Sequence, residues 1–214
     1  AGGGSGGCLK LITTDNLVAD AMCSGCNLSS ASDNVFLGRD TGRCNSSGDG
    51  NIAIGDQAGK CNTVGGNNIF IGKLAGQYAM PDGTCTGSSN VFIGSYAGRY
   101  ANRAQYSCHN IAIGMYAGYC TGANCNVFVG NNAGRKSSSY SNVAIGQDAG
   151  CGKTGTYNLF FGREAGRADG GGNCNIGMGF CALCSVSGGA SNVAIGGCKT
   201  GYCISSGSNN IALG

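Results

Sequence analysis

Residues 110–118 read Asn-Ile-Ala-Ile-Gly-Met-Tyr-Ala-Gly, and this pattern recurs along most of the 214-residue chain. Successive copies lie 16 to 22 residues apart, as the intervals from Asn110 to Asn126 and from Asn68 to Asn90 illustrate. Self-similarity at a nearly fixed period is the signature of a repeat protein, in which each unit buries its surface against its neighbours.

The order of residues within one unit predicts a strand followed by two corners. The first and third residues after the asparagine are aliphatic, and in a strand they share one face, while the residue between them points the other way. The glycine that follows, such as Gly55 or Gly146, suits a corner with positive φ. Helices are not expected, because glycine and β-branched residues dominate and no 3.6-residue apolar stripe is present. We therefore predict an all-β, single-chain β-solenoid of about 11–12 coils, with 16–22 residues per coil.

The domain organisation follows from where the repeats are regular. Residues 1–33 are expected to form an N-terminal segment with a degenerate first coil at Asn16, and residues 34–214 the solenoid repeat domain. Longer intervals predict bulging loops at residues 77–89 and 99–109.

The repeated asparagine is expected to be structural. In a stacked coil its amide can bond to the asparagines above and below, which satisfies polar groups at a bend. The predicted asparagine ladder consists of Asn34, Asn51, Asn68, Asn90, Asn110, Asn126, Asn142, Asn158, Asn175, Asn192 and Asn210.

The middle residue of the strand alternates between phenylalanine and small residues. If the flanking aliphatic residues fill the coil, this row faces outward as an apolar contact stripe, which usually marks a protein contact. The opposite polarity, with phenylalanine inside, also leaves an apolar face uncovered, unless loops fold back over it. The phenylalanines of the predicted stripe are Phe36, Phe70, Phe92, Phe128 and Phe160.

Composition restricts the function classes. The net charge of +3 is too small to indicate nucleic acid as a partner, and no apolar run is long enough for a membrane span. Fifteen cysteines favour an oxidising, extracellular setting. Cys44 and Cys61 lie ten residues after their ladder asparagines, and Cys181 and Cys198 six after theirs. Since equivalent positions of adjacent coils lie within disulfide range, Cys44–Cys61 and Cys181–Cys198 are the disulfide candidates.

The repeats, such as residues 142–150 (Asn-Val-Ala-Ile-Gly-Gln-Asp-Ala-Gly), resemble those of trimeric autotransporter adhesin heads, the YadA-like β-roll, and of phage tail-fibre proteins. The resemblance covers about residues 34–214 and implies extracellular, fibrous, surface-exposed proteins that are often trimers. The period is longer than that of the adhesin heads, and the high cysteine content is foreign to both families, so trimerisation does not follow from the resemblance.

No catalytic or metal-binding constellation is recognisable in the sequence, and no cofactor is expected. The single histidine, His109, falls in an irregular loop, and Glu164 is the one glutamate. The pairs Cys23/Cys26 and Cys181/Cys184 have zinc-type spacing, but a rod would keep them far apart. We therefore expect a protein that is not an enzyme.

Two surface features suggest binding. Five basic residues lie nine positions after their ladder asparagines: Arg43, Lys60, Arg99, Arg135 and Arg167. They predict a broken basic ridge along the rod. This ridge could bind acidic polysaccharide or remain a solvated edge. Asn27 and Asn45 begin sequons for N-glycosylation, which also arise by chance in a chain this rich in asparagine and serine.

These features predict a structural subunit of a secreted fibre, in which coils stack head to tail onto copies of the same chain and disulfides join neighbouring coils. Such heterologous contacts do not close and therefore give filaments. The alternative is a surface adhesin or tail-fibre shaft, trimeric in one version, whose loops at 77–89 and 99–109 contact a receptor or glycan.

Overall fold

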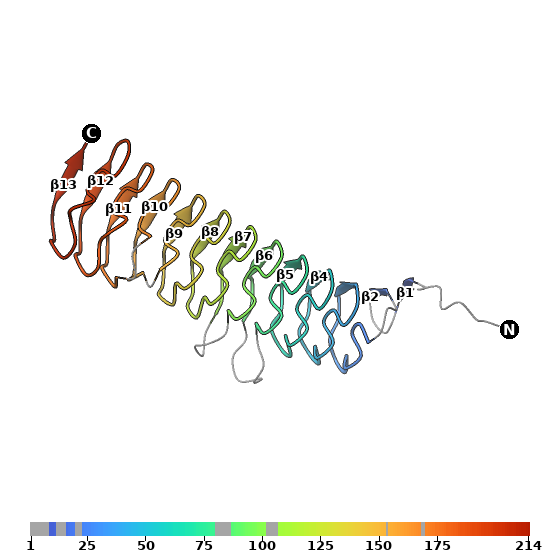
Figure 1. Cartoon of the computed structure of the whole chain (residues 1–214). Helices are drawn as coiled ribbons and strands as arrows, with labels where there is room; N and C mark the ends of the chain where they lie inside the picture. Colours follow the sequence, from blue (N-terminus) through green and yellow to red (C-terminus); the bar gives the residue numbers. More distant parts are fainter. Residues whose placement is uncertain are drawn as a thin grey trace.

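The computed structural model describes residues 9–11, 16–19, 23–79, 87–101, 107–152, 154–167 and 170–214. Within these ranges the chain winds into a β-solenoid with no helices, as the sequence predicts (Figure 1). Thirteen strands form one sheet in chain order. The strands are β1 (Leu9–Leu11), β2 (Leu17–Ala19), β3 (Val35–Leu37), β4 (Ile52–Ile54), β5 (Ile69–Ile71), β6 (Val91–Ile93), β7 (Ile111–Ile113), β8 (Val127–Val129), β9 (Val143–Ile145), β10 (Leu159–Phe161), β11 (Ile176–Met178), β12 (Val193–Ile195) and β13 (Ile211–Leu213).

The strand register is the same at every step from β3 onwards. Equivalent residues of successive coils pair, for example Ile52 with Ile69 and Ile54 with Ile71. All pairs from β2 to β13 are parallel, whereas β1 pairs antiparallel with β2. Asn16 and β2 continue the stack, so the degenerate first coil belongs to the same solenoid as residues 34–214.

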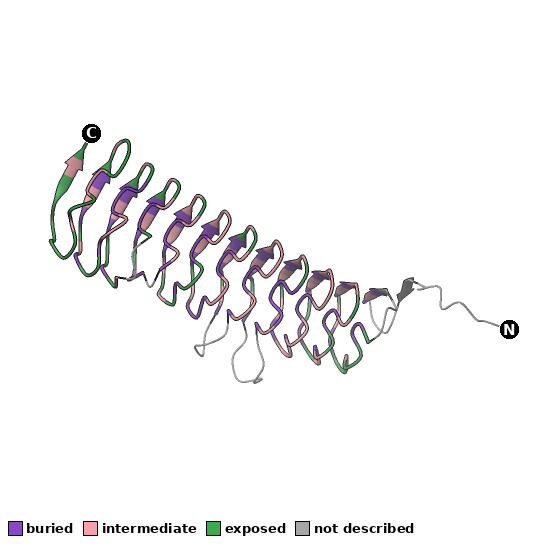
Figure 2. Ribbon diagram, in the orientation of Figure 1, coloured by how far each residue is buried: buried purple, intermediate pink, exposed green. Residues whose placement is uncertain are grey.

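The side-chain polarity of the strands is the reverse of our first expectation. The phenylalanines of the predicted contact stripe are buried, so they form the core instead of an outer surface (Figure 2). Their exposed fractions are 1% for Phe36, Phe70, Phe92 and Phe128, and 5% for Phe160. The aliphatic residues at both ends of each strand point outward and are mostly half-buried. The other polarity that the sequence allowed is therefore the correct one.

The size of the coil interior explains this polarity. A three-residue strand directs two side chains to one face and one to the other, and the narrow interior has room only for one. Alanine in one coil leaves space for the ring in the next, as where Ala112 pairs with Phe128. Where two phenylalanines follow each other, Phe70 and Phe92, their ring centroids lie 5.7 Å apart. The core thus combines a row of large and small side chains from the strands with a column of buried alanines after the corners, such as Ala97 and Ala117.

The predicted asparagine ladder is present and runs through every coil. The backbone N–H of each ladder asparagine donates to the side-chain Oδ1 of the preceding one, over 2.8–3.0 Å, from Asn34 on Asn16 to Asn210 on Asn192. The side-chain Nδ2 donates as well, to the neighbouring asparagine or to a loop carbonyl such as Gly65 O. Polar groups that are buried at the bend are thereby satisfied.

Glycine at the corner after each strand permits the close stacking of coils. Gly114 has φ +131°, a conformation essentially restricted to glycine. A Cβ at this position would lie 2.5 Å from the carbonyl oxygen of Gly130 in the next coil. The backbones of neighbouring corners therefore touch, which a side chain would prevent.

Two further columns adopt positive φ mostly without glycine, with Gly50 the described exception. They lie immediately before the ladder asparagine, as at His109 (57°), and six residues after it, as at Tyr116 (57°). None of the positions is valine, isoleucine or threonine, the residues for which this conformation is most strained. These turns set the direction in which the side chains of the loop leave the coil.

Two sequence predictions fall partly outside the described residues. Part of each predicted bulging loop, residues 80–86 of one and 102–106 of the other, is not described. Within the described ranges, the chain forms no helix with the length and apolar character needed to cross a bilayer.

Candidate interaction surfaces

The outer face of the sheet carries a continuous apolar band. We define the apolar band as the first and third residues of strands β3 to β13, all of which are aliphatic, methionine or phenylalanine. Most are half-buried, because each packs against its neighbours above and below, and the exposed fraction reaches 37% for Ile113 and 51% for Phe161. The sequence predicted an uncovered apolar face, and the structure places it on these residues.

The predicted basic ridge does form one column on the loop side. Backbone hydrogen bonds place Lys60 beside Cys44 and Arg135 beside Cys120 in successive coils, which fixes the common register. Acidic partners differ along the column. Arg43 and Lys60 share Asp40, at Nη1–Oδ1 3.8 Å and Nζ–Oδ2 3.5 Å. Arg167 Nη1 lies 3.2 Å from Glu164 Oε2.

The middle of the ridge carries the uncompensated charge. Within the described residues, neither Arg99 nor Arg135 has a carboxylate at ion-pair distance. The Arg99 guanidinium instead lies 5.0–5.8 Å from the centroids of three tyrosine rings, and that of Arg135 5.6–5.9 Å from two. The rings belong to Tyr78, Tyr96, Tyr100, Tyr116 and Tyr119. This tyrosine cluster was missed at the sequence level, because its members occupy three different positions of the repeat.

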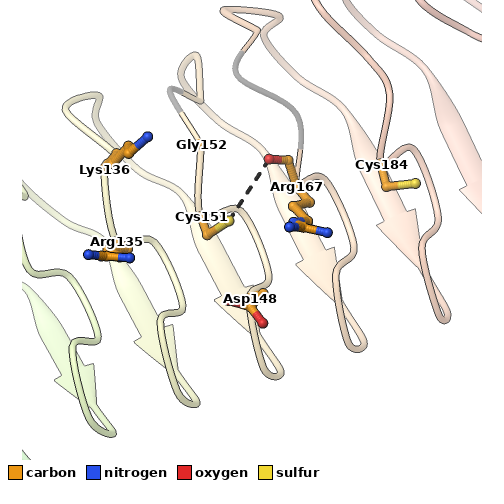
Figure 3. Close-up of a pocket in the computed structure, with 7 residues that line it drawn as sticks. All are labelled: Arg135, Lys136, Asp148, Cys151, Gly152, Arg167 and Cys184. Carbon is orange, nitrogen blue, oxygen red and sulfur yellow. Dashed lines mark hydrogen bonds between the residues drawn. The ribbon is translucent and has the colours of Figure 1, made fainter.

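A groove of about 440 Å³ opens beside Arg135 and spans four coils (Figure 3). Its lining residues are Arg135, Lys136, Asp148, Cys151, Gly152, Arg167 and Cys184. Asp148 Oδ1 accepts a hydrogen bond from Asn132 Nδ2 over 3.1 Å, and the Cys151 thiol faces the Arg167 carbonyl oxygen at 4.0 Å. Three cations against one carboxylate make the groove net positive. Lys136 was not predicted, because it lies one residue outside the basic column.

Of the two disulfide candidates, the structure supports the proximity of Cys44 and Cys61. They occupy equivalent positions of adjacent coils, and their thiols are in hydrogen-bond contact but not bonded. Burial, followed by the neighbouring Cys44, raises the pKa of the Cys61 thiol to about 11. Because the thiolate is the reactive form, the folded state slows the chemistry of Cys61 at neutral pH.

The expected alignment of Cys181 with Cys198 is wrong. The backbone N–H of Lys199 donates to the Phe180 carbonyl, and Lys199 shares the positive φ of Cys181, so Lys199 is the residue equivalent to Cys181. One extra residue after Gly196 shifts the register in this coil. The neighbours of the Cys181 thiol are instead Cys184 and Glu164, whose Oε2 lies 3.4 Å away.

The environment of Cys181 affects two pKa values. Burial, followed by the contacts with Cys184 and Glu164, raises the pKa of Cys181 to about 12. The same thiol contact, followed by the charges of Arg167 and Arg163, lowers the pKa of the Glu164 carboxyl. Among the described residues no three metal-ligating side chains converge, here or near Cys23 and Cys26.

The two sequons differ in accessibility. Asn27 is exposed, whereas Asn45 is completely buried, and its amide both donates to the Gly48 carbonyl and accepts from the Gly48 N–H, over 2.8 and 3.0 Å. A glycan on Asn45 is incompatible with this packing, so this prediction is wrong for the folded protein. His109 is exposed and occupies the turn before Asn110.

No family model, curated protein or solved structure matches this chain.

Proposed function

We propose that this chain is a rod-shaped structural subunit of an extracellular fibre. The observation that supports the proposal best is the repetition of one coil-to-coil contact along the chain: the same strand register and the same asparagine bond recur at each step from Asn34 to Asn210. A module built in this way has its length set by the number of coils and resists bending through many equivalent contacts.

Head-to-tail stacking would extend the same contact. Each coil offers its neighbour the backbone N–H and C=O groups of a parallel strand in constant register, as between β4 and β5. A coil of the same type from another copy would bind through the same groups. Sheet edges are the usual sites for strand addition.

Disulfides are proposed to reinforce the rod. A narrow coil with alternating phenylalanine and alanine buries little apolar surface, and covalent links are a common compensation in such small cores. Cys44 and Cys61 are placed to form one link between coils, and the high cysteine count supports the extracellular setting in which such links persist.

Electron microscopy of the purified chain, with and without reductant, tests this proposal. Filaments of uniform width that lengthen with protein concentration are expected, and reductant should make them less resistant to urea. Short particles of constant length at all concentrations would contradict head-to-tail assembly.

A second candidate function, a shaft that binds an acidic glycan, is favoured by the groove at Arg135. Arg135, Lys136 and Arg167 line it, and only Arg167 has a described carboxylate partner at ion-pair distance. The double substitution Arg135→Gln/Lys136→Gln should abolish retention on a sulfated-polysaccharide column. The matched control is Arg39→Gln, because Arg39 already forms an ion pair with Asp56 at 2.8 Å. Equal retention of both variants would exclude the groove as a glycan site.

A further inference from the structure

The apolar band is uniform in a way that the rest of the surface is not. All 22 of its side chains, two from each of the 11 strands β3–β13, are apolar, although polar residues occupy most of the loop positions. The fold does not require this, because the inward residue of each strand already supplies the core.

No described part of the chain covers the band. The described residues form a single sheet and no helices, and the rest of each described coil returns on the side of its strand where the middle residue is buried (Figures 1 and 2). The band residues of β3 to β6 are half-buried, and exposure is higher further along the chain, at 37% for Ile113, 51% for Phe161 and 41% for Ile195. The described residues therefore leave the band partly in contact with water.

The dimensions of the band are those of an interface. Strands about 4.8 Å apart and three residues long give a face of about 48 by 10 Å, which is roughly 500 Å². Monomeric proteins seldom expose a contiguous apolar patch larger than this without a function. Two such faces together bury about 1,000 Å², the lower limit for specific interfaces, before any contribution from flanking residues.

The shape of the band restricts which surfaces can cover it. It is long and narrow, and it repeats at the strand spacing, so a complementary surface has to be equally long and apolar and repeat at the same distance. The same band on a second copy meets all three conditions. Polar residues border it, including Arg39, Asp56 and Lys73, which gives the apolar centre and polar rim typical of protein interfaces.

We propose that two copies of this chain pair side by side through their apolar bands, related by a two-fold axis, with the two sheets packed face to face about 10 Å apart. The pairing makes a two-sheet sandwich in which the band residues of both copies interdigitate. It does not depend on the proposed fibre function, because the coil ends stay free in the pair.

Analytical ultracentrifugation in the presence of reductant tests the pairing without interference from intermolecular disulfides. At a chain concentration of about 100 µM, well above the micromolar affinities that interfaces of modest size reach, the smallest species should have twice the 21.2 kDa mass of one chain. Any longer head-to-tail assembly should have an even multiple of the mass of one chain. A monomer or a trimer at this concentration would overturn the proposal.

Two variants test whether the band forms the contact. Ile113→Glu places a charge at the centre of the band and, since each change occurs twice in the pair, should weaken association by more than about a hundredfold. The fourfold variant Val91→Thr/Val127→Thr/Val143→Thr/Val193→Thr keeps side-chain shape and strand preference and should weaken it by at least about tenfold. Circular dichroism shows whether each variant folds. If the glutamate variant does not fold, the threonine variant still tests the contact.

The control is Tyr140→Glu, at a loop residue that is 47% exposed and lies away from the band. It should associate as the unmodified chain does. If the threonine variant is folded and pairs with unchanged affinity, the band is not the contact, and end-to-end association would be the remaining explanation for a doubled mass.

Discussion

Removing one side chain from the middle of the asparagine ladder should destabilise the solenoid strongly. Asn126 is completely buried. Its Oδ1 accepts the backbone N–H of Asn142 at 2.9 Å, and its Nδ2 donates to Asn110 Oδ1 at 3.1 Å and to the Asn124 carbonyl at 3.2 Å. Asn126→Ala leaves the buried Asn142 N–H without its partner. The Asn124 carbonyl still accepts the Ser141 N–H at 3.1 Å, and Asn110 Oδ1 still accepts the Asn126 backbone N–H at 3.0 Å.

The magnitude follows from the number of groups left unsatisfied. A buried polar group that loses its partner costs about 1–3 kcal/mol, so the orphaned Asn142 N–H gives a loss of about 1–3 kcal/mol in the free energy of unfolding. Urea unfolding, followed by circular dichroism in reductant, measures this loss and compares it with Asn131→Ala, a half-exposed asparagine for which only a backbone hydrogen bond is described.

The comparison with the control decides the result. Asn131→Ala should change the free energy of unfolding by less than about 0.5 kcal/mol, as is usual for surface positions. If Asn126→Ala unfolds at the same urea concentration and with the same slope as Asn131→Ala, then the ladder does not stabilise the fold, and its regularity would have to be explained in another way.

Three further predictions concern the core, the corners and a thiol. Phe92→Ala, which removes a core ring that is 1% exposed, should cost about 3–5 kcal/mol in urea unfolding, far more than Ile93→Ala on the outer face. Gly114→Ala should cost at least about 2 kcal/mol, through the strained φ and the contact with the Gly130 carbonyl, and an unchanged melting temperature would contradict this. The folded-state pKa of Cys61, about 11, exceeds the ordinary 9.0, so between these pH values the folded protein keeps a proton that the unfolded chain has lost. The free energy of unfolding of the reduced protein should therefore fall as pH rises from 9 to 11, and Cys61 should cause no change in it below pH 9. A Cys61→Ser variant should lose less stability over that pH range.

The sequence was sufficient to predict the architecture, because the constraints on the repeat are local. An asparagine before each strand and a glycine after it reflect the bend and the close corner, and both appear at fixed places in the chain. The strand register then follows from the spacing of the repeats. Asn16 was recognised as the start of a coil even though few other residues of that coil match.

The errors arose where the sequence gives no information on the third dimension. The pattern places Ile111 and Ile113 on one face and Ala112 on the other, but not which face is inside; the size of the interior decides that. Cys181 and Cys198 have equal offsets from their asparagines, yet one inserted residue after Gly196 separates them in space. Asn45 has the sequon, but the turn that buries its amide is not visible in the motif.

The groove at Arg135 illustrates a different limit. Four successive coils contribute its lining, and Lys136 and Cys184 come from different positions of the repeat. Residues at the same distance from their ladder asparagines are recognised in the sequence as a stacked column, and the basic column was predicted in this way. A cluster formed by different repeat positions of neighbouring coils has no such signal, so the groove was not predicted.

Hydrogen exchange across the whole chain, measured by mass spectrometry in reductant, tests most directly whether one continuous ladder holds the rod together. Peptides containing the ladder asparagines and their strands should show slow exchange in every coil from Asn34 to Asn192, with fast exchange confined to the loops between them. Protection limited to a few coils, with the rest exchanging as fast as the loops, would contradict a single uninterrupted solenoid.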